Sequence, residues 1–123
     1  MKIPKREVVK FVIQATLRRK TAKSQKEFVS AINNELRKVD ADYSITGKRL
    51  REISFSVPGV RVNIYLKDGP VPKRCPSCGS KLRRKWDRNL KGRKVLRELE
   101  CTKCSYTGRM GKWAPARYRF SAQ

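Results

Sequence analysis

Four cysteines in two pairs constrain this chain more than any other feature of its 123 residues. They follow the pattern C-x2-C-x22-C-x2-C, with Cys75 and Cys78 in the first pair and Cys101 and Cys104 in the second. A two-residue gap lets one tight turn present two sulfurs to one ion, and zinc favours four thiolates in a tetrahedron at about 2.3 Å. The spacing predicts one structural zinc ion, because four protein ligands leave no position for water or substrate.

Three other interpretations of the cysteines remain open. Two disulfides would need an oxidising compartment, whereas we expect the cytoplasm. The N-terminus predicts no signal peptide, because Lys10 and Gln14 interrupt its apolar run, and no stretch approaches the roughly 20 apolar residues of a membrane span. A redox-active C-P-x-C pair works alone, so it would leave the second cysteine pair unexplained. The cysteines that bind iron–sulfur clusters are usually spaced differently. These considerations favour zinc.

The segment between the two pairs has the pattern of a β-hairpin. In the first arm, one face holds Leu82, Arg84 and Trp86, which alternate with Arg83 and Lys85. In the second arm, Val95, Arg97 and Leu99 alternate with Leu96 and Glu98, and Asn89–Gly92 forms the tip. A third strand is predicted from Tyr106 towards Met110. Two cysteine turns joined by a hairpin make a zinc ribbon, and this segment resembles that family in motif and length. Gly79 suits the positive φ of the first turn, whereas the second turn has Ser105 where glycine is frequent.

The N-terminal part predicts three helices. Pro4 suits a first helical turn, and apolar residues then recur at helical spacing as far as about Leu17. Ser24 and Glu27 have the spacing of a capping box at the start of a second helix. The apolar residues that follow on one face of this helix are Phe28, Ala31, Ile32, Leu36 and Val39. Thr46 caps a short third helix, in which Leu50 and Ile53 face inward.

A strand follows the three helices. Pro58-Gly59 predicts a turn, and the alternation over 60–66 predicts a half-buried strand. This order of elements, and residues 44–66 in particular, resemble the recognition helix and wing of a winged helix-turn-helix domain. A wing is usually a hairpin, so either Phe55–Val57 supplies its second strand or the wing is truncated. Three-helix domains of this shape also dock proteins.

These patterns together predict an α+β fold. The expected parts are a winged-helix-like domain over residues 1–68, a linker over 69–72 and a small antiparallel zinc ribbon over 73–110. A basic and aromatic tail, kept irregular by Gly111 and Pro115, covers 111–123.

The charge indicates the class of partner. Lysine and arginine number 32 against 10 acidic residues, a net charge of +22, and such self-repulsion is most simply offset by a polyanion. A membrane surface would need an amphipathic basic helix or a lipid anchor, and neither is evident. Without histidine, a glycine-rich phosphate loop or a paired-carboxylate motif, we expect neither an enzyme nor a small-molecule substrate.

Three groups of basic residues are the candidate nucleic-acid contacts. Trp86 lies within the hairpin group and either stacks on a base or packs inside the ribbon. The tail either inserts into folded RNA or packs back onto the helices. The candidates on the third helix, the hairpin and the tail are, in order, Lys48, Arg49 and Arg51; Lys81, Arg83, Arg84, Lys85, Arg88, Lys91, Arg93 and Lys94; Arg117 and Arg119.

Charge on every segment favours an RNA-binding, ribosome-associated component, because many ribosomal proteins are small, very basic and carry a zinc ribbon. The alternative is a DNA-binding regulator or nucleoid protein, since the pairing of helix-turn-helix and zinc ribbon resembles archaeal transcriptional regulators. A sequence-specific regulator needs a more localised basic face. A protein-docking module would leave the charge unexplained.

Overall fold

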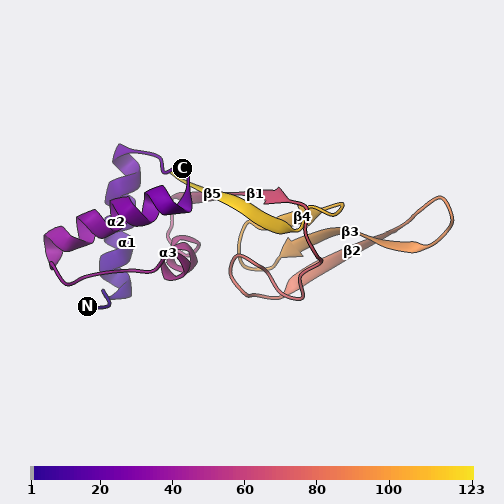
Figure 1. Cartoon of the computed structure of the whole chain (residues 1–123), viewed down its shortest axis with the longest axis horizontal. Coiled ribbons are helices and arrows are strands. Elements are labelled where there is room, and N and C mark those ends of the chain that lie inside the picture. The colour runs from indigo at the N-terminus through magenta and orange to yellow at the C-terminus, as the bar shows by residue number, and fades with distance from the viewer. Residues whose placement is uncertain (1) are drawn as a thin grey trace. The chain divides into compact units, whose positions relative to one another are not determined.

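A computed structural model describes residues 2–123 (Figure 1). These residues form three helices and five strands, so the predicted mixed α+β class with antiparallel strands is confirmed. The chain divides into two compact units. The helical unit comprises the chain up to Asn63 together with Tyr118–Gln123, and the cysteine unit comprises Ile64–Arg117. Residue 1 of the domain predicted over 1–68 lies outside the described residues.

Three helices build the helical unit: α1 (Arg6–Arg19), α2 (Gln25–Val39) and α3 (Gly47–Ser54). Each buries the apolar stripe that its sequence predicts, which is where amphipathic helices obtain most of their stability. Val39, expected on the inner face of α2, is instead exposed at its end. The buried helical residues are Val9, Val12, Ile13, Leu17, Phe28, Ile32, Leu36, Leu50 and Ile53.

The predicted helix caps are present. The Glu27 amide donates to Ser24 Oγ at 3.1 Å, and the Arg49 amide donates to Thr46 Oγ1 at 3.3 Å. The Glu27 carboxylate accepts from the Lys23 amide at 3.2 Å, one residue earlier than the usual capping box. These bonds satisfy amide groups that have no partner within a helix, so they fix where α2 and α3 begin.

The first strand, β1 (Val60–Lys67), pairs with the last, β5 (Ala114–Ala122) (Figure 1). The alternative that Phe55–Val57 supplies the second wing strand is therefore wrong: Phe55 caps the end of α3 in helical backbone and a turn follows. The tail is also a strand rather than irregular chain. Pro115 is tolerated because a two-stranded sheet has only edge strands.

The end of β5 completes the helical unit. Phe120 is fully buried and its ring stacks on Phe28 with centroids 4.3 Å apart. Its backbone exchanges two hydrogen bonds of 2.9 Å with Ala22, in the connection between α1 and α2. Of the two alternatives for the tail, packing onto helices is what the structure shows for Phe120.

The cysteine unit is built on an antiparallel sheet of β2 (Leu82–Arg88), β3 (Lys94–Cys101) and β4 (Thr107–Arg109), in that order. The predicted hairpin is confirmed, with β2 and β3 as its arms. Its register shifts between Lys85, which faces Glu98, and Trp86, which faces Leu96.

That shift leaves Arg97 as a one-residue bulge, and a bulge reverses which side chains share a face. The predicted grouping of Val95, Arg97 and Leu99 on one face is therefore wrong. Leu96 joins Leu99 at the core, and Val95 is exposed.

The predicted third strand is present as β4, and a tight turn ends it. Met110 and Gly111 both have positive φ, at 46° and 88°, as the central residues of a type I′ turn require. The Lys112 amide donates to the Arg109 carbonyl at 2.9 Å and closes this turn. β4 therefore stops at Arg109, and the chain reverses into β5.

The core of the cysteine unit surrounds two of its cysteines. Leu99, Tyr106 and Trp113 are buried beside Cys75 and Cys101. The Tyr106 hydroxyl donates to the Trp113 carbonyl at 2.7 Å. A Cβ at Gly108 would lie 2.7 Å from both the Trp113 ring and the Tyr106 hydroxyl, so glycine is needed for this packing.

Among the described residues, no helix combines the length and apolar character needed to cross a membrane.

Candidate metal centre and basic hairpin

The four cysteine sulfurs converge on one point of the cysteine unit. All four lie within 4.8 Å of one another, and the pairs Cys75–Cys104 and Cys78–Cys101 are each 3.5 Å apart. All four are free, which excludes the disulfide alternative, since bonded sulfurs lie about 2.05 Å apart. Sulfurs around a tetrahedral ion at about 2.3 Å are separated by about 3.8 Å, so this cluster has the size and donor set for one metal ion.

The first cysteine turn depends on glycine. The Gly79 amide donates to the Cys75 carbonyl at 2.8 Å, and the Cys75 amide donates to the Ser80 carbonyl at 2.9 Å. Gly79 has φ of 79°, as predicted for this position. The Cys78 and Ser77 amides also donate to the Cys75 sulfur, so they stabilise a thiolate there.

The second turn reaches a similar result without glycine. The amides of Lys103 and Cys104 each lie 3.3 Å from the Cys101 sulfur, and the Tyr106 amide lies 3.4 Å from the Cys104 sulfur. Among the described non-glycine residues only Met110 has positive φ, so Ser105 adopts an ordinary backbone conformation. Serine is therefore compatible with this turn.

The thiols share their protons unevenly. The pKa of Cys75 is lowered to about 5, chiefly because the Cys104 thiol donates a hydrogen bond to its sulfur. The same hydrogen bond raises the pKa of Cys104, and burial raises that of Cys101. A cation bound among the four sulfurs would stabilise the negative charge of the other cysteines as thiolates too. The thiolate is the form of cysteine that binds metal.

The basic residues predicted on α3 are largely engaged within the helical unit. Arg49 donates to the Pro4 carbonyl at 3.0 Å. Arg51 donates to Gln25 Oε1 at 3.0 Å, and its guanidinium carbon lies 4.9 Å from the centroid of a tyrosine ring, that of Tyr118. Lys48 alone of the predicted trio is exposed.

The basic residues of the hairpin differ. Lys85 is half-buried and forms ion pairs with Glu98 at 3.6 Å and Glu100 at 3.2 Å. Trp86 is 49% exposed, which excludes the alternative that it packs inside the core. The other predicted hairpin cations are exposed and form no ion pair within residues 2–123: Lys81, Arg83, Arg84, Arg88, Lys91, Arg93 and Lys94.

The two predicted tail residues are both exposed on β5. The guanidinium carbon of Arg117 lies 4.5 Å from the centroid of the Tyr65 ring, within the cysteine unit. Arg119 belongs to the helical unit.

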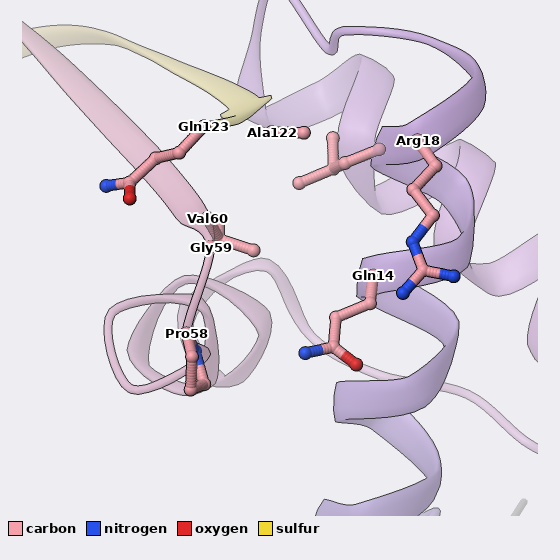
Figure 2. A pocket seen from close by; sticks show the side chains of 8 residues that line it. Gln14, Arg18, Pro58, Gly59, Val60, Ala122 and Gln123 are labelled. Carbon is pink, nitrogen blue, oxygen red and sulfur yellow. The ribbon is translucent and has the colours of Figure 1, made fainter.

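A small pocket opens in the helical unit (Figure 2). Gln14 and Arg18 of α1 line one side, and Pro58–Val60 with Gln123 line another. Its volume is about 230 Å³, below the roughly 300–1,000 Å³ of typical small-molecule sites. We assign no ligand to it.

Comparisons of the chain with protein-family models, curated proteins and solved structures found no match.

Proposed function

We propose that this protein is a non-enzymatic, ribosome-associated RNA-binding protein. In this proposal the cysteine unit is a zinc ribbon and the helical unit is a winged-helix-like domain whose wing uses β1 and β5. The exposed, unpaired basic residues of the β2–β3 hairpin are the observation that carries the proposal.

Zinc as the metal is supported by the donor set. Four thiolates suit zinc, and also a single iron, and they leave no open position for catalysis. The backbone amides that donate to the Cys75 and Cys101 sulfurs add support, because they orient and stabilise the thiolates. Elemental analysis of protein purified without chelator should find about one zinc per chain. Folded protein that contains iron instead, or no metal, would contradict this part of the proposal.

RNA as the partner is supported by the distribution of unpaired charge. Residues 81–94 hold eight basic residues and one acidic residue. Seven of the eight, all but Lys85, form no ion pair within residues 2–123, and these cations line a hairpin that can follow a phosphate backbone. Binding would release counterions condensed on the polyanion, and this release offsets the self-repulsion of the free protein.

DNA remains the alternative because of the order of elements in the helical unit. Base reading by α3 would need side chains free to enter the major groove. Arg49 and Arg51 are instead held by contacts within the unit, which favours RNA binding by the hairpin over base reading by α3.

Sedimentation of a gently prepared cell lysate through a density gradient tests the proposal. The protein should migrate with a ribosomal subunit in moderate salt and should be released by ribonuclease. A parallel sample treated with deoxyribonuclease is the control and should be unchanged. Migration as free protein, or release only by deoxyribonuclease, would contradict the proposal.

A further inference from the structure

One face of the β2–β3 hairpin changes character along its length. Residues directly opposite in an antiparallel pair share a face, so Leu82, Arg84, Trp86 and Arg88 lie with Cys101, Leu99, Leu96 and Lys94. Nearest the cysteines this face belongs to the core, with Leu99 fully buried. Towards the tip it is exposed. We name this exposed end the outer face, made of Arg84, Trp86, Arg88 and Lys94.

Trp86 is the unusual member of the outer face. The cysteine unit has a second tryptophan, Trp113, which is only 4% exposed in the core, whereas Trp86 is 49% exposed. The Lys94 ammonium lies 5.6 Å from the centroid of the Trp86 ring. An aromatic ring presented to solvent beside cations is the arrangement that binds a base by stacking and holds its phosphate nearby.

The outer face also places two cations against each other. Arg88 and Lys94 are directly opposite across the strands, and like charges in that position are destabilising. Arg88 contacts the Gly92 carbonyl at 2.9 Å, but no acidic residue of the described chain forms an ion pair with either cation. An anion bound between them would relieve the repulsion.

The acidic residues of the hairpin lie on its opposite face. Asp87 pairs with Arg97 at 3.6 Å, and Glu98 and Glu100 pair with Lys85. Strand alternation and register place all three acids away from Trp86. The outer face is therefore purely cationic, and its charge complements phosphate.

We infer that the outer face binds single-stranded RNA, with an unpaired base stacked on Trp86 and an adjacent phosphate held between Arg88 and Lys94. This inference rests on the proposed RNA-binding function and specifies the form of RNA. A duplex keeps its bases stacked on one another and offers phosphates but no free base face.

The test compares two decamers at one salt concentration. One is a uridine decamer, and the other has the same ribose-phosphate chain without bases. Trp86→Ala should weaken binding of the uridine decamer by about tenfold, whereas its affinity for the abasic decamer should equal that of the wild type. Trp86→Tyr should restore most of the lost affinity. Zinc content and the emission of buried Trp113 check that each variant is folded.

Fluorescence gives a second readout. The uridine decamer should quench wild-type emission, because a stacked base contacts Trp86, but it should leave the Trp113 emission of Trp86→Ala unchanged. If folded Trp86→Ala binds the uridine decamer as tightly as the wild type, the inference is overturned while RNA binding stands. If wild-type protein binds neither decamer and no other RNA, the proposed function itself fails.

Discussion

Helix α3 and the β2–β3 hairpin are both rich in basic residues, but the side chains of these residues have different surroundings. On α3, Arg49 and Arg51 bond to Pro4 and Gln25, so their charge helps to hold the helical unit together. On the hairpin, Arg83 and Arg84 are exposed and form no ion pair with any described residue. The density of positive charge along a sequence therefore does not locate a binding surface, because it does not show which cations already have partners.

The difference has a structural cause. A helix packed on two others brings its side chains within reach of carbonyls and amides from those neighbours, as Arg51 reaches Gln25 on α2. A hairpin that extends beyond its core has few neighbours towards its tip, so its cations stay in solvent. Leu90 at the tip is fully exposed, in agreement with this view.

Removal of the metal should have the largest effect and should separate the two regions. Structural zinc contributes on the order of 10 kcal/mol to folding, so a chelator, or Cys101→Ala, should unfold the cysteine unit and with it the hairpin. The emission of Trp113 should shift to the red, measured in a Trp86→Phe background. Helical circular dichroism should largely remain. Native Trp113 emission after complete metal removal would contradict a structural metal.

Phe120→Ala should affect the opposite region. It removes the ring stacked on Phe28 and should lower the free energy of unfolding of the helical unit by about 3–5 kcal/mol. Thermal unfolding followed by helical circular dichroism measures this loss. Exposed Arg119→Ala, one residue earlier, is the control and should change stability little. Equal stability of the two variants would show that the end of β5 is not part of this unit.

Arg51→Met and Lys48→Met form a matched pair on α3. Loss of the Gln25 hydrogen bond and the Tyr118 ring contact should make Arg51→Met less stable by about 1–2 kcal/mol. Lys48→Met should be near neutral because Lys48 is exposed. RNA affinity should change little in either, measured by titration at fixed salt. A large loss of duplex DNA affinity in both would support base reading by α3.

Thr46→Ala should have the smallest effect. It removes the side-chain acceptor for the Arg49 amide and should cost about 1 kcal/mol, measured by denaturant unfolding. Thr46→Ser keeps the hydroxyl and should retain most of the stability. A loss as large for serine as for alanine would mean that the methyl packing, not the cap, matters.

Local features were predictable from sequence because their determinants lie within a few residues. Ser24 and Thr46 cap helices through amides three residues later, and the spacing of the cysteine pairs defines their turns. The first cysteine turn needs a residue with positive φ, and the glycine at position 79 indicates this in the sequence. All four cysteines of the candidate metal site could accordingly be predicted from the sequence.

Features set by distant partners were missed. β1 pairs with β5, which lies about fifty residues later, and the sequence of neither strand indicates which strand it pairs with. The same holds for Asn33, which bonds to both backbone polar groups of Ile45 and fixes the connection before α3. The bulge at Arg97 has no sequence signal either. Which hairpin residues are exposed together could therefore be known only from the strand register in the structure.

The salt dependence of RNA affinity tests the central claim most directly. Two triple-alanine variants remove equal charge: Arg83, Arg84 and Lys91 from the hairpin, or Lys26, Lys48 and Arg61 from the helical unit, all exposed. Each lost phosphate contact should reduce the slope of log affinity against log salt by about 0.7 for single-stranded RNA. We expect the hairpin variant to reduce the slope by about 2 and the control to leave it nearly unchanged. Equal slopes in the two variants would contradict the hairpin as the RNA-binding surface.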